Sequence, residues 1–591
     1  MDSIVKTSLK LFTLNLLCIS AYSAPLPVPE IDIGTIDPAR IGRDITAKPI
    51  PILSTDKELE IPVLSQSVDL GDAKKYKFKL KKVNFTDNTV ISSAELEEDY
   101  SPYYNKTIDL AKLLELVNIT TLKYRDAGYV LSQAYLPAQD IDKEVGIIQV
   151  SILEGYVNEV TVSGDSMPYS TKILLKQYGE RMSQERPITK ATLERYALLS
   201  QDIQGASVKV VFSPAPNQAG GANAEFIVDD GHLLGVSTTV DNRGTRLLGP
   251  LELSGTVDQY NIFYGNHTVG NIVRDDHKEL RVYNFSHTQP LNSDGLAASF
   301  QYIRTLSNPN YKDLPTPIYD VETPGKGHNY TAQLSYPLIR ARTHNLMSQI
   351  KYDISEGITW SRDPSLTLFN ERLHMARVGL TFDWLDSVFF DMLGLTSIGV
   401  EYTRGLPTRG AFLREDVATR PNLKKNFQKV TGNLTRQQPF WDSFEFKLMA
   451  NGQYAYDNLS SSEEYGYGGK DMGLGYDSYE ISGEHGIAAK AELSYTVPTA
   501  KLLPSNLSVL NLQTDIFAFY DAGKVWNKHS AVSGQNKQDV AKSTGFGIRG
   551  SLYDYFTYEA YYAKPLARDL QNTLDTSSRV FFLVGFAYPA G

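Results

Sequence analysis

From about residue 229 to its end, the chain contains many segments in which apolar and polar side chains alternate. In residues 443–456, one face is apolar and aromatic from Phe444 to Tyr456, and the other carries polar side chains such as Lys447 and Gln453. Residues 329–338 and 376–383 repeat the alternation. Because successive side chains of a β-strand point to opposite faces, such a segment can present one face to lipid and the other to water. The pattern predicts a transmembrane β-barrel, and a barrel can serve as a conduit.

The composition is compatible with this prediction. The chain has 591 residues with 42% hydrophobic residues, and its mean hydropathy is −0.27. A barrel tolerates this polarity because every second strand residue faces water. The 36 tyrosines suit interfacial girdles, although a large soluble β-protein would also carry many. The net charge of −10, without a basic cluster, argues against a nucleic-acid partner.

The N-terminus resembles a secretory signal. Lys6 and Lys10 flank a short apolar core, and Ala21-Tyr22-Ser23 provides small residues at the cleavage spacing, so residues 1–23 are expected to be removed. The single cysteine, Cys18, lies inside this segment, so the mature chain would have no disulfide and no thiolate site. A signal peptide followed by barrel strands predicts the outer membrane of a Gram-negative bacterium.

Residues 24–75 are rich in proline and are expected to form an extended linker. Within it, residues 37–46 could form a short helix, because Asp37 can cap it and Pro38 suits its first position. The alternative, that this stretch is simply more linker, stays open.

Two α/β modules are expected next. Residues 76–154, the first module, have the order β-α-α-β-β, with an amphipathic helix over 109–126 that ends near Gly128 and strands at 77–83, 129–136 and 146–153. Residues 155–228, the second module, repeat the order, with strands at 157–162, 208–213 and 224–228 and helices at 171–178 and 189–200. Residues 229–591 then form the barrel. Fifteen strands are visible, and since single-chain bacterial barrels have an even number, we expect sixteen antiparallel strands with the missing one at 259–270.

The sequence contains none of the common hydrolase, zinc-protease or phosphate-loop motifs, so no catalytic residue, metal or cofactor is predicted. His287, Ser293 and Asp294 lie close in sequence, but they are interpreted as a polar turn. A barrel hydrolase stays open as an alternative, because geometry rather than spacing defines such a site.

Three groups of residues resemble a known family. The segments Gly128-Tyr129, Leu136-Pro137 followed by Gln139-Asp140, and Glu154-Gly155 are similar to the first POTRA domain of two-partner-secretion transporters. Asp241–Thr245 resembles the end of the family's first barrel strand, and 519–526, with Phe519, Asp521 and Gly523, resembles a late strand with an inward Asp.

The resemblance implies an α+β pair of periplasmic POTRA domains followed by an all-β barrel of sixteen strands, with residues 37–46 as a plug helix. It also implies a non-enzymatic pore that secretes one large exoprotein: an adhesin, a cytolysin or a contact-dependent inhibition toxin. Outer-membrane lipid and the barrel-assembly machinery would be the other partners. Two alternatives stay open: a barrel-assembly or insertase relative, and a porin or barrel enzyme with a periplasmic extension.

One departure from the family is informative. The family's long loop between strands 11 and 12 carries an Arg that meets the inward Asp, but the matching loop here, 457–485, has Leu474 before Gly475 and Tyr476. Leucine cannot pair with a carboxylate. Asp521, on the expected luminal face with Phe519, would then be bound by another group such as Lys470, or be hydrated as one more luminal acid. We expect Leu474 and Tyr476 to hold the loop by packing against luminal apolar side chains.

Overall fold

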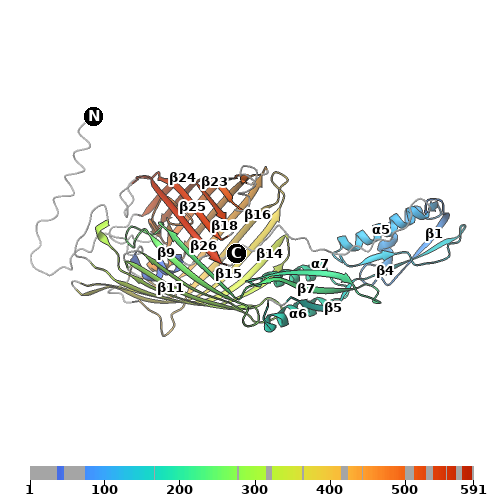
Figure 1. Ribbon diagram of the computed structural model, residues 1–591, viewed down its shortest axis with the longest axis horizontal. Helices are drawn as coiled ribbons and strands as arrows, with labels where there is room; N and C mark the ends of the chain where they lie inside the picture. The colour runs from blue at the N-terminus through green and yellow to red at the C-terminus, as the bar shows by residue number, and fades with distance from the viewer. Residues whose placement is uncertain are drawn as a thin grey trace, which may run out of the picture.

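The computed structural model describes residues 36–45, 73–164, 167–275, 278–313, 322–362, 365–413, 419, 423–441, 443–499, 511–527, 537–553, 555–567 and 576–588. Two small α/β modules extend from one end of a wide β-barrel (Figure 1). The expected signal peptide, most of the Pro-rich linker and the last three residues lie outside the described part of the chain. None of the described helices has the length and apolarity needed to cross a membrane.

The first module is a four-stranded sheet with the order β2-β1-β4-β3, covered by helices. Its elements are β1 (Lys77–Thr86), α4 (Ser93–Glu97), η1 (Ser101–Tyr103), β2 (Thr107–Asp109), α5 (Leu110–Asp126), β3 (Gln133–Tyr135) and β4 (Gly146–Leu153). The expected strand 129–136 is mostly wrong, because only 133–135 pair with β4. Gly128, at φ +94°, ends α5, and the Tyr129 N–H then bonds back to the Tyr124 carbonyl, so the chain turns before it can extend.

The second module is a three-stranded sheet with the order β5-β7-β6 and two helices on one face. Its elements are β5 (Tyr156–Ser163), α6 (Tyr169–Ser183), α7 (Lys190–Gln201), β6 (Ala206–Pro214) and β7 (Gly221–Gly231). They follow the expected order, and the two helices bury their apolar stripes, including Leu174 and Leu193, on the sheet.

The barrel is closed and antiparallel, with sixteen strands, as expected. They are β8 (Leu234–Asp241), β9 (Glu252–Tyr260), β10 (His267–Asp275), β11 (Leu280–Pro290), β12 (Ala297–Ser307), β13 (Gly325–Arg340), β14 (His344–Ser361), β15 (Leu366–Asp386), β16 (Gly394–Gly405), β18 (Gln428–Phe440), β19 (Phe444–Ala455), β22 (His485–Thr496), β23 (Gln513–Trp526), β24 (Gln538–Leu552), β25 (Phe556–Pro565) and β26 (Arg579–Tyr588). Closure pairs β26 with β8, so the last strand covers the free edge of the first. A two-residue strand, β17 (Phe412–Leu413), adds to β15.

The missing strand lies later than predicted. Residues 261–266 form a turn in which Asn261 and Tyr264 have positive φ angles, and β10 begins only at His267. The apolar residues that suggested a strand serve another purpose: Tyr264 packs against the second module and its hydroxyl bonds Gln177. The alternation there therefore reflects contact with the module and not contact with lipid.

The two faces of the barrel wall differ as the alternation predicts. Outward side chains such as Ile350, Val378 and Phe546 are 59%, 52% and 61% exposed, which in a membrane means exposed to lipid. Inward side chains are largely buried, because two segments of the chain fill the lumen.

Candidate functional site

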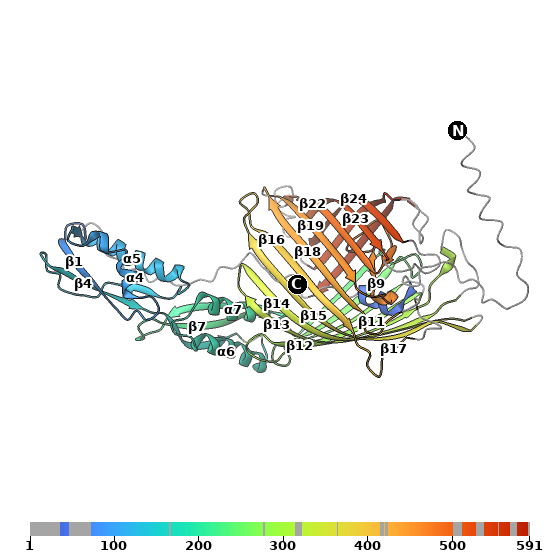
Figure 2. The ribbon, with the colours of Figure 1, turned by 180° about the vertical axis from the view of Figure 1, so that it is seen from behind.

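The lumen of the barrel holds a short helix and a long loop. Figure 2 shows the helix, α2 (Pro38–Ile45), in blue inside the barrel. The loop joins β19 to β22 and covers residues 456–484, with η4 (Ser461–Glu463), β20 (Tyr465–Tyr467) and β21 (Ile481–Gly483) inside it. The candidate site is the set of contacts that hold these two segments in the pore.

Helix α2 begins as its sequence predicts. The Asp37 carboxylate accepts a hydrogen bond from the Ala39 N–H at 2.9 Å, and Pro38 takes the first helical position. The helix lies against β12, β13 and β14. The Asn329 side-chain amide donates to the Ala39 carbonyl at 2.8 Å, and Gly327 leaves room for the backbone of Pro38. Residues 37–46, for which the sequence allowed either a helix or a linker, thus contain a helix that lies in the pore.

A buried charge cluster connects α2, the loop and the barrel wall. Glu463 of the loop is 1% exposed and pairs with Arg43 of α2 at 2.5 Å. It also pairs with Arg377 of β15 at 3.0 Å and with Lys429 of β18 at 2.8 Å. Burial alone would raise the pKa of the Glu463 carboxyl, but the three cations hold that pKa well below its usual range. Glu463 is thus an ionised link between the helix and the wall.

Two further contacts join helix and loop. Ser461 donates a hydrogen bond to the second Asp37 oxygen at 2.8 Å. The Arg40 guanidinium lies 3.6 Å from the centre of the Tyr479 ring, a cation–π contact. Arg40 is 1% exposed, and within the described part of the chain its guanidinium nitrogens have no hydrogen-bond partner. Burial of the Arg40 guanidinium therefore costs desolvation free energy, whereas the other contacts of α2 stabilise its position in the lumen.

The tip of the loop is held at Asp521, on the luminal face of β23. This carboxylate is fully buried and accepts hydrogen bonds from the Tyr467 hydroxyl at 2.6 Å and the Leu474 N–H at 3.1 Å. Ser543 of β24 donates to it twice, from its hydroxyl at 2.5 Å and its backbone N–H at 3.1 Å. Four neutral donors thus replace the missing guanidinium. The interpretation of Asp521 as merely hydrated is wrong.

Lys470 is not the partner of Asp521 either. Its ammonium group pairs with Glu252 of β9 at 2.7 Å and Asp241 of β8 at 3.4 Å, on another part of the wall. The resemblance to the family indicates a charge pair, and it therefore predicts a cation as the partner of Asp521. Backbone and hydroxyl donors carry no sequence signal of that kind, which is why Tyr467 and Ser543 were missed.

The apolar side chains of the loop tip divide between two clusters. Leu474 packs with Phe519 and with Phe517, Tyr561, Ala563 and Phe581, as expected. Tyr476 lies in the neighbouring cluster with Tyr467, and its hydroxyl donates to the Lys542 carbonyl at 2.6 Å. The Gly475 N–H donates to the Ser543 hydroxyl at 3.2 Å. Gly523 contributes space, because a Cβ there would collide with the Tyr467 ring.

The residues of the first-module motif make structural contacts. Glu154 accepts from the backbone N–H groups of Thr89 at 2.6 Å and Val90 at 3.1 Å. Gln139 uses its side-chain amide to pair with both backbone groups of Gln149 at 2.8 Å, which extends the sheet beyond β3. The remaining motif residues are placed as follows: Leu136 lies against the core, Pro137 accepts from Gln139, and Asp140 is exposed.

The two glycines of the motif lie at the junction of the modules. The Gly128 carbonyl accepts from the Lys190 N–H at 2.7 Å, and the Gly155 carbonyl accepts from the Ile188 N–H at 2.9 Å. Gly155 also lies against the Leu131 backbone, where a Cβ would collide. The motif therefore positions the first module on the second.

The second module is in turn fixed to the barrel. Asp202 pairs with Arg340 at 2.6 Å, and the Tyr196 hydroxyl donates to Asp294 at 2.8 Å. Asp294 and Ser293 thus face the second module, whereas His287 bonds Thr268 within the wall. These three residues form a polar turn and a strand contact, in agreement with their interpretation from sequence.

Comparisons with known proteins agree with this architecture. Residues 225–550 match the family model described as haemolysin secretion/activation protein ShlB/FhaC/HecB, and residues 78–155 match the POTRA domain of ShlB type. The heme/hemopexin transporter protein HuxB of Haemophilus influenzae (strain 86-028NP) is 23% identical over 510 residues, which cover 84% of this chain and 85% of that protein. The outer membrane transporter CdiB of Escherichia coli is 21% identical over 473 residues, 77% of this chain and 76% of that one.

Solved structures show the same fold. CdiB from Escherichia coli superposes with a TM-score of 0.70 at 18% identity, covering 93% of this chain and 95% of that one. CdiB from Acinetobacter baumannii gives 0.61 at 17% identity, covering 93% and 96%. With the family model matching more than half of its length, the chain belongs to the ShlB/FhaC/HecB haemolysin secretion/activation family, and it is an outer-membrane two-partner-secretion transporter with its POTRA domains in the periplasm.

Proposed function

We propose that the described structure is the closed, resting state of the secretion pore, with α2 as its plug. The observation that supports this is the buried cluster at Glu463, which joins the helix, the loop and two strands of the wall. For a partner to pass as an extended chain, α2 leaves the lumen, and the pairs of Arg43 and Asp37 with the loop break.

A disulfide lock tests the plug directly. A Cβ built on Gly357 of β14 lies 3.5 Å from the Ala39 Cβ, at the short end of the range for a disulfide. Since the only native cysteine lies in the expected signal peptide, the pair Ala39→Cys and Gly357→Cys can be introduced without competing thiols. Under oxidation, we expect secretion to stop and conductance to stay low, and a reductant should restore secretion.

Each single-cysteine variant is the control for this lock, because it carries the same substitution without the bond. Undiminished secretion by the oxidised pair would show that the helix need not leave. In a complementary experiment, removal of residues 25–47 should raise single-channel conductance and largely spare secretion. Unchanged conductance would reduce the segment to a linker.

The POTRA modules are proposed to capture the partner by adding its extended segment to a sheet edge. The edges of the two modules differ. In the first module the edge strands β2 and β3 have 3 residues each, whereas the edge strands β5 and β6 of the second have 8 and 9 residues. A longer edge offers more unpaired backbone groups, so the second module supplies the better docking edge and the first module guides the partner to it.

Deletion of residues 76–154 should abolish secretion and leave the barrel assembled, as judged by its resistance to unfolding in detergent without heating. To separate edge pairing from side-chain contact, Thr161→Pro and Val162→Pro on β5 remove successive backbone donors, which point to opposite sides of the strand. One of the two should impair secretion while the sheet stays folded, and Thr161→Ala should be silent. Secretion by the deletion variant at the normal level would refute the role of the first module in capture.

The partner is proposed to be a large exoprotein: an adhesin, a cytolysin or a contact-dependent inhibition toxin. Among the relatives, one is named as a heme/hemopexin transporter. The barrel-assembly machinery is the proposed partner for insertion, and it would recognise the last strand, in which Phe586 and Tyr588 face lipid. Pull-down of the disulfide-locked transporter, with the unsecreted partner held at its POTRA modules, would identify the partner.

A further inference from the structure

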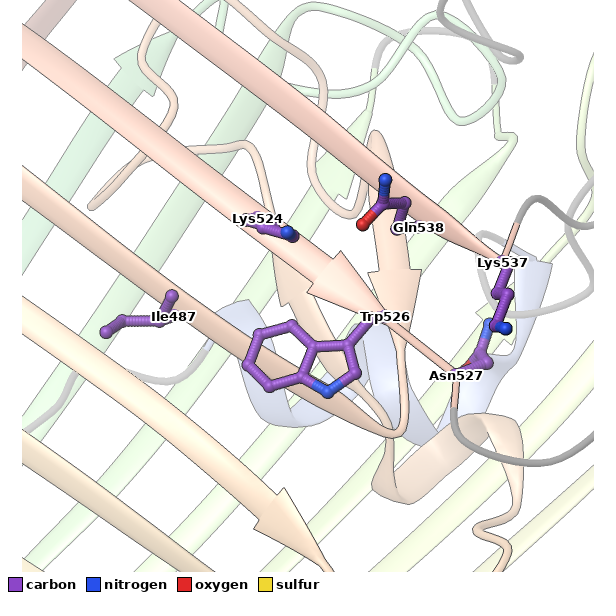
Figure 3. Close-up of a pocket in the computed structure, with 6 residues that line it drawn as sticks. All are labelled: Ile487, Lys524, Trp526, Asn527, Lys537 and Gln538. Atoms are coloured by element: carbon purple, nitrogen blue, oxygen red, sulfur yellow. The ribbon is translucent and has the colours of Figure 1, made fainter.

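The outer face of β22–β24 carries an unusual group of side chains at the end of the barrel remote from the POTRA modules. The second module contacts the turns at 261–266 and 293–294, so that end is periplasmic, and the opposite end faces the cell exterior. Strand β23 ends and β24 begins at the exterior end. Figure 3 shows a pocket there, lined by Ile487, Lys524, Trp526, Asn527, Lys537 and Gln538.

The lysines of this region point away from the lumen. On β23 the inward residues Asp521 and Val525 are buried, and Lys524, on the opposite face, is exposed. Lys542 of β24 is likewise exposed, and its neighbours Ala541 and Ser543 are buried. Lys564 of β25 is also exposed, next to the buried Ala563. All three belong to the face that the barrel presents to the membrane.

The strand register places these three lysines in a diagonal row. Lys542 of β24 lies opposite Ala522 of β23, and Ala522 is two residues before Lys524 on β23. Lys564 lies opposite Thr544, two residues after Lys542. Diagonal neighbours of this kind are about 7–8 Å apart. Lys537 adds a fourth ammonium group at the start of β24.

These cations have no acidic partner within the described part of the chain, where no ion pair is formed by any of the four. They occur in a chain with a net charge of −10, so the row is not a consequence of general basicity. Like charges this close repel one another, and the repulsion grows where water is partly excluded, as at a membrane interface. An anion on the membrane side would remove it.

Directly below the row, toward the middle of the barrel, the same face is apolar. Phe546 and Tyr562 are 61% and 36% exposed, and their rings lie 5.5 Å apart. An amphipathic molecule would therefore find cations at the height of its headgroup and an apolar surface along its chains. The amide groups of Asn527 and Gln538 and the indole of Trp526 add groups that can contact a polar headgroup.

We propose that this pocket and the lysine row bind the phosphate-bearing headgroup of a lipid in the outer leaflet. Its phosphates lie between Lys524, Lys542 and Lys564, and its acyl chains run along Phe546 and Tyr562. The site also reaches the pore, because Lys542, whose side chain faces the lipid, accepts the Tyr476 hydroxyl of the luminal loop on its backbone carbonyl. A bound lipid thus steadies the strand that anchors the loop tip.

The test is native mass spectrometry of the full-length protein with diphosphoryl lipid A and with the same lipid after dephosphorylation. Wild type should retain the phosphorylated lipid at least about tenfold more tightly, and Lys524→Gln/Lys542→Gln/Lys564→Gln should lose this preference. The matched control is Lys77→Gln/Lys79→Gln/Lys81→Gln on β1, which changes the charge equally at exposed positions outside the barrel. It should bind as wild type does.

Equal binding of the two lipids, or wild-type binding by the β23–β25 variant, would overturn the proposal. Inorganic phosphate is added as a competitor: displacement of the lipid at low millimolar phosphate would show a site for free anions, which also contradicts a lipid site. Assembly of the variant is checked by its heat-dependent mobility in gels, and a second variant, Phe546→Ser, weakens the acyl-chain contact without touching a charge. It should lower retention of both lipids alike.

Discussion

The anchoring of the loop tip at Asp521 leads to a quantitative prediction. In Asp521→Asn, one carboxylate oxygen becomes an NH₂ group. The oxygen Oδ1 accepts from Tyr467 and twice from Ser543, so the NH₂ group takes the place of Oδ2. There it faces the Leu474 N–H, donor against donor, and that hydrogen bond is lost.

The expected magnitude follows from the contacts. A hydrogen bond to a charged group contributes about 1.5–3 kcal/mol, so the substitution should raise the population of the released loop about 10- to 150-fold. Tyr476→Ala removes a buried aromatic side chain and its bond to Lys542. Truncation of a buried aromatic costs about 3–5 kcal/mol, or about 150- to 5,000-fold. We therefore expect Tyr476→Ala to release the loop, and to impair secretion, more than Asp521→Asn does.

The assay is the rate at which a maleimide labels a cysteine in the loop. Met472 is 6% exposed in the Tyr476 cluster, and Met472→Cys provides the only thiol of the mature chain. When opening is fast and rare, the labelling rate is proportional to the released population. Leu114→Ala on the first module serves as a control that should not change labelling. A larger effect of Asp521→Asn than of Tyr476→Ala would contradict this order and show that the carboxylate, and not packing, dominates the anchor.

Three further predictions concern the plug. Glu463→Gln removes the charge shared by Arg43, Arg377 and Lys429, so conductance in planar bilayers should rise toward that of the 25–47 deletion; wild-type conductance would exclude the cluster as the latch. Arg40→Met should lower the frequency of pore opening in planar bilayers. The reason is that burying a guanidinium without hydrogen bonds costs more free energy than the roughly 2 kcal/mol that its contact with Tyr479 contributes. More frequent opening would contradict this prediction. The pKa of Glu463 is depressed, so its contribution to the stability of the closed pore is fully present above the ordinary carboxyl pKa and is lost only as the pH falls through the lower pKa of the folded state. Conductance at about pH 5 should therefore equal conductance at about pH 7. A rise in conductance between these values would mean that Glu463 titrates in that range.

The class of fold follows from the sequence alone, because alternation of polar and apolar residues is a local property of each strand. The strand faces, the order of the modules, the helix cap at Asp37 and the luminal orientation of Asp521 all follow from neighbouring residues. The position of β10 did not, since the alternation at 260–264 reflects contact with the second module rather than with lipid.

The site itself was decided by tertiary structure. Asp37 and Ser461 are 424 residues apart in the chain, and Arg43 and Glu463 are 420 apart, so no local pattern could connect them. The partners of Asp521 were missed for a related reason: two backbone N–H groups and two hydroxyls are donors that almost any sequence offers. Only closure of the barrel around the helix and loop selects which of these common groups meet this buried carboxylate, because a charge excluded from water is retained where all its acceptor sites are filled.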